Sequence, residues 1–162
     1  MSRPVTVTRT RTVTTTTGAP EAVSSTAPRC HTDQLSFTYT TNGAAGTILI
    51  DGELTNRSQA TCGLYGYPGL GLLDSHGAAL PTSALRSRGS VIPAVAERLV
   101  VLAPGGKADF YAAFSDVDPQ PCPLAAKLEV TPPNAYMHLT ADAGFTPCRG
   151  RIHVSPVFAP GA

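Results

Sequence analysis

Four cysteines constrain this chain more than any other feature: Cys30, Cys62, Cys122 and Cys148. Each stands beside a proline, a glycine, a threonine or a charged turn residue, and outside the apolar centres of the strand-like segments. An even number of cysteines at the borders of elements indicates two disulfides, and disulfides persist in oxidising compartments outside the cytoplasm. We therefore expect an exported protein, secreted or associated with the cell envelope, that is held together by two disulfides.

Four cysteines can pair in three ways. We predict the bridges Cys30–Cys62 and Cys122–Cys148, because each of them would join neighbours along the chain. Each bridge would close a loop of a few tens of residues, which stabilises a fold by ~3–4 kcal/mol in the chain-entropy model. A link between Cys30 and Cys148 would contradict this pairing.

The length and composition restrict the class of protein. The chain has 162 residues, 15 glycines and 15 prolines, which suits one strand-rich domain with a tail. Its formal net charge of +1 gives no electrostatic reason to expect nucleic acid or an anionic membrane as a partner. No apolar run reaches the ~20 residues that span a bilayer. We therefore expect no nucleic-acid partner and no membrane span in this chain.

The first 29 residues differ in composition from the rest and are rich in Thr, Ser, Ala, Arg and Pro. Residues 6–17 alternate but hold too few valines to bury a face, and residues 18–28 are typical of a flexible linker. Two interpretations stay open, a stalk that crosses a cell wall and a disordered leader without a role. Because no signal peptide is recognisable, we expect one, or an anchor, upstream of Met1. The predicted organisation is a leader or tether at 1–29, one domain at 30–158 and a flexible end at 159–162.

From Cys30 onward apolar and polar residues alternate in short segments, which is the period of half-buried strands. The predicted strands are 34–40, 47–55, 61–65, 69–74, 98–103, 107–115, 127–131, 136–140 and 151–158. The turn at 103–106 is predicted to join its flanking strands in a hairpin, and residues 75–97 to loop over one end. Many short strands without a long amphipathic helix predict an all-β, antiparallel, immunoglobulin-like (Greek-key) sandwich.

Several blocks of residues carry a resemblance to a known family. They are TCGLYGYPG at 61–69, Leu72-Leu73-Asp74, the opening Cys30 with Asp33-Gln34-Leu35, LAPGG at 102–106, Cys122-Pro123 and VTPPN at 130–134. Over about residues 30–157 the chain resembles an actinobacterial four-cysteine domain of unknown function, found in exported envelope proteins and lipoproteins of mycobacteria and streptomycetes. The resemblance implies an immunoglobulin-like sandwich in the cell envelope. It implies no agreed activity and carries over no catalytic residues.

No catalytic or metal-binding constellation stands out in the sequence. The chain has no Gly-x-Ser-x-Gly motif, and its four histidines lack the spacing of a Ser/His/Asp triad. His138 and His153 lie on two late strands that could be neighbours, but alternation turns both outward and turns Met137 into the core. Two histidines without a third ligand make a weak metal site. We therefore predict a protein that is not an enzyme and needs no cofactor or metal.

Tyr65 and Tyr67 flank a glycine-rich bend and are candidate recognition aromatics, since tyrosine combines a rigid apolar body with a polar tip. The alternative is that one of them packs beneath the bend. Residues 56–58 (Asn-Arg-Ser) match an N-glycosylation acceptor, and we expect this turn to be exposed.

The function that these observations favour is a non-catalytic binding or scaffolding module of the cell envelope. Its partner would be an envelope protein, a glycan or a small ligand. The alternative, from another class, is an envelope metal-handling protein or a hydrolase whose residues converge only in three dimensions.

Overall fold

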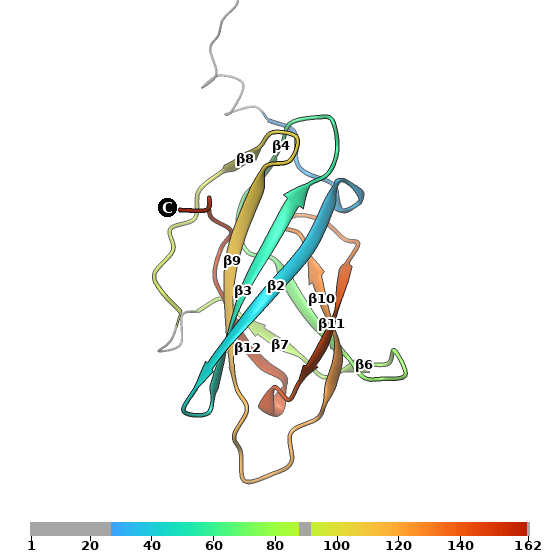
Figure 1. Ribbon diagram of the computed structural model, residues 1–162, viewed down its shortest axis with the longest axis vertical. Coiled ribbons are helices and arrows are strands. Elements are labelled where there is room, and N and C mark those ends of the chain that lie inside the picture. Colours follow the sequence, from blue (N-terminus) through green and yellow to red (C-terminus); the bar gives the residue numbers. More distant parts are fainter. Residues whose placement is uncertain (1–26, 88–91, 162) are drawn as a thin grey trace, which may run out of the picture.

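The computed structural model describes residues 27–87 and 92–161, and these residues form an all-β structure with two disulfides (Figure 1). The five-stranded sheet has the order β2 (Leu35–Ala44), β3 (Thr47–Asn56), β9 (Lys107–Ser115), β12 (Arg151–Val154) and β7 (Ser83–Leu85). The four-stranded sheet has the order β11 (Leu139–Phe145), β10 (Ala125–Thr131), β5 (Gly69–Leu73) and β6 (Ala79–Leu80). β4 (Cys62–Leu64) pairs with β8 (Val100–Leu102), and two short 3-10 turns are η1 (Thr32–Gln34) and η2 (Cys148–Gly150).

The core lies between the two larger sheets, because alternate residues of their long strands turn inward. In the five-stranded sheet Ile50 stands opposite Ala112, and Leu54 opposite Ala108, and all four side chains are fully buried. Leu128 and Val130 of β10 close the core from the other sheet. The aromatic rings of Phe114 and Phe145, one from each sheet, lie 4.9 Å apart between their centroids. Burial of this apolar surface is the main force that holds the sheets together.

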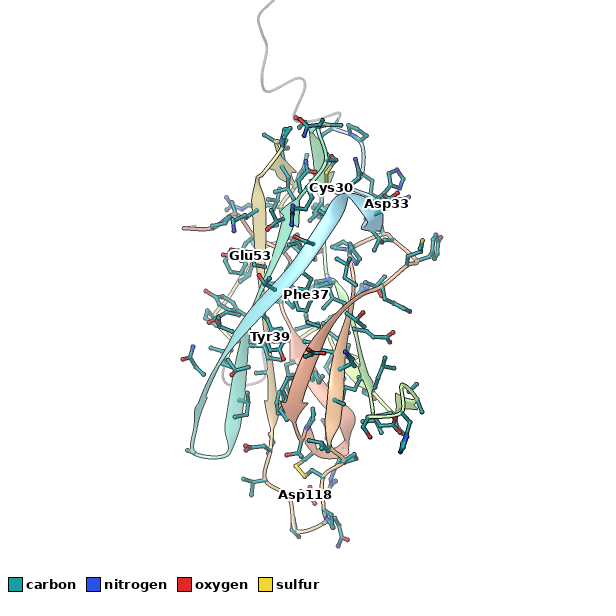
Figure 2. All side chains as sticks on the ribbon, turned by 45° about the vertical axis from the view of Figure 1, so that its right-hand side comes forward. Cys30, Asp33, Phe37, Tyr39, Glu53 and Asp118 are labelled. Carbon is teal, nitrogen blue, oxygen red and sulfur yellow. A yellow bond between two sulfur atoms is a disulfide. The ribbon has the colours of Figure 1, made fainter. Side chains whose placement is uncertain are left out.

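The two disulfides are those predicted from chain proximity, Cys30–Cys62 and Cys122–Cys148. They lie at opposite ends of the molecule, the first at Cys30 and the second near Asp118 (Figure 2). Near the first bridge, Arg29 pairs with Gly63 in a parallel bridge, and the Gly63 N–H donates to the Pro28 carbonyl at 2.7 Å. Sheet pairing therefore begins before the predicted domain boundary at residue 30.

The predicted leader lies mostly outside the described residues, which begin at residue 27. Within the described ranges, no helix is long and apolar enough to cross a membrane.

Two predictions about connections are wrong. Residues 75–97 are not a plain loop, because they contain β6 and β7, and β7 pairs with β12 in parallel. This parallel pair makes the sheets mixed rather than purely antiparallel. The turn at 103–106 forms, but β8 pairs with β4 instead of β9. The reason is that the Gly105 N–H donates to the Asn56 carbonyl and the Asn56 N–H to the Gly106 carbonyl, so the turn carries the chain from one sheet to another.

Met137 was predicted to lie in the core, and its side chain is 70% exposed. The predicted strand 136–140 begins only at Leu139, which pairs with Val130. Before it, a turn closed by the Ala135 N–H and the Pro132 carbonyl, with Asn134 at φ 61°, lengthens the connection. The alternation therefore starts three residues later than the sequence indicated.

Asn56 was predicted to stand in an exposed turn, and it is fully buried. Its amide nitrogen donates to the carbonyls of Ala60, Leu102 and Ala103 at 2.8, 3.0 and 3.3 Å. Its amide oxygen accepts bonds from the backbone and the hydroxyl of Ser58. The acceptor-like triplet is thus an internal structural device, and only its middle residue, Arg57, is exposed.

Candidate functional site

Residues 92–99 connect the β7 region to β8, and we call them the strap. Ile92 is buried at its start, and Val100, the first residue of β8, is buried just after its end. Between these anchors, residues 93–99 form no hydrogen bond or ion pair with other described residues. In Figure 1 this yellow-green segment runs outside β9 towards β8. The strap is therefore held by its ends rather than along its length.

One side of the strap bounds a hollow of about 520 Å³, which we call the apolar hollow. Its lining residues are Pro93, Ala94, Val95, Ala96, Arg98, Leu99, Val100, Tyr111, Phe158 and Ala159. The rings of Tyr111 and Phe158 lie 4.8 Å apart between centroids and form one wall. Arg98 is the one charged residue in this lining. A mainly apolar surface with a few polar groups is the usual composition of a small-ligand site.

Backbone pairing brings the two aromatic residues together. Tyr111 is an outward residue of β9, and its N–H donates to the Ser155 hydroxyl at 2.8 Å. After β12, Asp109 and Phe158 exchange two backbone hydrogen bonds, each of 2.8 Å. This antiparallel bridge places Phe158 beside β9, although the two residues are far apart in the chain.

Residues 93–96 also line a second hollow of about 520 Å³, which we call the arginine–tyrosine hollow. The guanidinium carbon of Arg86 lies 5.2 Å from the centroid of the Tyr67 ring, a cation–π contact. The Ser87 hydroxyl and His153 Nδ1 are 2.9 Å apart and form a hydrogen bond. Arg86 is again the one charged residue in the lining.

The structure separates the two candidate recognition tyrosines. Tyr67 is partly buried, packs against the core and lines the arginine–tyrosine hollow. Tyr65 is 49% exposed and lines neither hollow of the strap. The backbone turns between them at Gly66, whose φ of 102° is a conformation that glycine adopts without strain. The two rings therefore do not form one recognition surface.

A third hollow, of about 390 Å³, lies on the outer face of β2, β3 and β9, and we call it the acidic hollow. Asp51, Glu53 and Asp109 line it, and Glu53 stands opposite Asp109 in the register of β3 and β9. Lys107 Nζ pairs with Glu53 at 2.7 Å. Partial burial, followed by the negative charges of Glu53 and Asp51, raises the pKa of Asp109 above its usual value. Tyr111 and Phe158 separate this hollow from the apolar one, since they line both.

The histidines do not converge. His138 lies beside β11 in the four-stranded sheet, with Nδ1 2.6 Å from the Thr131 hydroxyl, whereas His153 lies on β12 in the five-stranded sheet. The expectation that they could be cross-strand neighbours is wrong. Across residues 27–87 and 92–161, no three His, Cys, Asp or Glu side chains gather in a way that could hold a metal ion.

Sequence reasoning missed the apolar hollow, although some of its signals were present. The alternation in 107–115 turns Tyr111 outward, and residues 75–97, which were expected to loop over one end, contain Arg86. No local pattern indicated that Phe158 pairs with β9 or that the strap lies next to Tyr111 and Phe158.

Comparisons with known proteins add the family and nothing on activity. No curated protein matches the sequence significantly. A family model matches residues 30–157, a range that spans both disulfides and the strands of the two larger sheets. The chain therefore belongs to the family described as Domain of unknown function (DUF4232).

Proposed function

We propose that this protein is an exported, non-catalytic binding or scaffolding module of the cell envelope, and that the strap with its two hollows is its binding surface. We include in this proposal the fold and the location that the sequence resemblance implies: an immunoglobulin-like Greek-key sandwich in envelope proteins and lipoproteins of actinobacteria. The two disulfides support an oxidising compartment. The Thr- and Pro-rich composition of residues 1–29 supports a tether that separates the domain from its point of attachment.

The observation that carries the proposal is the apolar hollow. Its volume of about 520 Å³ lies within the range of small-ligand sites. Its aromatic wall of Tyr111 and Phe158 and its single arginine are the residue types that dominate recognition energetics. Its lining contains no acid, histidine, serine or cysteine among the described residues, so its chemistry suits binding rather than turnover.

A hydrolase is the second candidate, and the acidic hollow favours it. There Asp109, with a raised pKa, stands directly opposite the ion-paired Glu53. A carboxyl group with a raised pKa close to a second carboxyl group is an arrangement that acid–base hydrolysis uses. Loss of a measured hydrolytic activity in Asp109→Asn, with binding at the strap retained, would favour this candidate.

The test of the proposed function is capture of components from envelope extracts by the immobilised full chain. Ala96→Phe would place a bulky side chain where the two hollows adjoin, because Ala96 is exposed and lines each of them. Ala78→Phe is the matched control, since Ala78 is an exposed residue of the turn before β6 and lines neither hollow. We expect a retained component that Ala96→Phe loses and Ala78→Phe keeps. Equal retention by both variants would contradict a binding surface at the strap.

A further inference from the structure

The charged residues that line the two hollows of the strap are both arginines, whereas Glu97 of the strap lines neither hollow. Arg98 lines the apolar hollow and Arg86 the arginine–tyrosine hollow, and neither pairs with a carboxylate of the described residues. No described carboxylate lines either hollow. An arginine beside an apolar surface, without an acidic partner in the fold, is a ready site for an anion.

The acidic hollow next to the apolar hollow determines how a negatively charged ligand would be oriented. Asp109, Glu53 and Asp51 lie on the far side of the Tyr111–Phe158 wall from the strap. A negatively charged group on a ligand would be repelled from that side and attracted towards Arg98. The apolar body of the same ligand would lie against the aromatic rings and the small side chains of residues 93–96. The backbone N–H groups of residues 94–99, which donate to no acceptor among the described residues, add further donors near the arginine.

Resting on the proposed function, we propose that the apolar hollow binds a small amphiphile with one carboxylate and an aliphatic body, and that Arg98 receives the carboxylate. The size of the hollow, the apolar character of its lining and its single cation select this class over a sugar, which needs many polar partners, and over a cation. The arginine can hold the carboxylate through two parallel N–H···O bonds.

The test uses three probes of equal chain length: decanoate and decyltrimethylammonium below their critical micelle concentrations, and decan-1-ol below its solubility limit. Binding to the full chain is followed by the methyl NMR signals of Val95, Leu99 and Val100. We expect decanoate to shift these signals in a saturable way and to bind about tenfold more tightly than the alcohol, since it adds a charge-assisted contact. We expect the cationic probe to bind more weakly than either.

Substitutions of Arg98 test whether its charge receives the carboxylate. Arg98→Gln, which removes the charge and keeps a polar side chain, is expected to weaken decanoate binding about tenfold and to leave decanol binding unchanged. Arg98→Lys is expected to restore most of the affinity. Arg57→Gln is the control, because Arg57 is exposed in the turn after β3 and lines neither hollow. Folding of each variant is checked by its circular dichroism spectrum.

Three outcomes would overturn the inference: equal binding of all three probes, decanoate shifts that map away from the strap, or no saturable decanoate binding up to millimolar concentration. If decanoate fails while Ala96→Phe still loses a component captured from envelope extracts, the ligand class is wrong and the proposed function stands. If capture is also unaffected by Ala96→Phe, both fail.

Discussion

Replacing the buried Asn56 by alanine tests whether one amide joins three segments of the fold. Asn56 ends β3, and its side chain bonds to backbone groups of residues 58 and 60 in the next turn and of 102 and 103 at the end of β8. Alanine keeps the backbone bonds to the 103–106 turn and removes all of the side-chain bonds. The substitution therefore isolates what the amide contributes.

The expected loss of unfolding free energy is about 3 kcal/mol. This figure combines roughly 1–3 kcal/mol for the buried bond to Leu102 with about 1 kcal/mol for the partly buried bonds to the neighbouring turn. A loss of this size is a large fraction of the ~5–15 kcal/mol that stabilises a typical domain.

Asn56→Asp adds a second readout. A carboxylate would face the three carbonyl oxygens that now accept from the amide, so its pKa would rise on folding. The folded variant would then keep its proton to a higher pH than the unfolded chain. Its stability should accordingly fall as pH rises from about 4 to 7, and the wild type should lack this added decline.

The assay is equilibrium unfolding in urea, followed by circular dichroism and by tyrosine fluorescence, since the chain has five tyrosines and no tryptophan. Asn42→Ala is the matched control, because Asn42 is exposed and makes one long bond, 3.4 Å, to Asp51. We expect the control to change stability by less than about 0.5 kcal/mol. If Asn56→Ala stays within about 1 kcal/mol of wild type with an unchanged m value, the amide does not hold these segments together.

Replacing Cys30 and Cys62 together by alanine is expected to lower the unfolding free energy by about 3–4 kcal/mol, because the bridge constrains 32 residues of unfolded chain; a loss below about 1 kcal/mol in urea would contradict this. Gly52→Ala is expected to cost about 2 kcal/mol, since its Cβ would overlap the buried ring of Phe110 on the neighbouring strand β9. Gly144→Ala, where nothing lies within 4 Å, is the control, and equal Tm values for the two variants would refute the argument. Asp109→Asn is expected to raise stability near pH 7 and not near pH 3, because the raised pKa of Asp109 makes wild-type stability fall as pH rises through that range. Thermal unfolding at both values measures this, and a variant no more stable near pH 7 would show that the carboxylate is not destabilising.

Periodicity predicted the long strands well, for a physical reason. The predicted range 47–55 became β3 (Thr47–Asn56), and 107–115 became β9 (Lys107–Ser115). Nine or ten residues with one buried face contain several full alternations, which fix both the type and the register of a strand. β6 and β7 have two and three residues, so neither contains enough of the period to be recognised. Their existence depends on strands elsewhere in the chain.

The wrong predictions concern residues whose surroundings come from distant segments. Asn56 reads as a turn residue because asparagine usually stands at the surface, and its burial depends on partners at residues 102 and 103. Met137 reads as a core residue because it is apolar and alternates with His138, and its exposure depends on the turn before β11. In both cases the residue type gave the average location, and tertiary contacts decided the actual one.

The candidate site also depends on contacts between distant segments, and one of its anchors depends on a disulfide. The strap ends where β8 begins, and β8 is fixed by pairing Val100 with Leu64 and Leu102 with Cys62. Cys62 is in turn bridged to Cys30. The cysteines, whose pairing was predicted from the sequence, therefore position one end of the strap. The strap itself was not predicted to be a binding site. Because residues 93–99 of the strap form no hydrogen bonds with the described residues, their place over the Tyr111–Phe158 wall depends on these anchors. A binding segment held only at its ends can adjust to a ligand at low cost, whereas the disulfide-linked strands beneath it cannot.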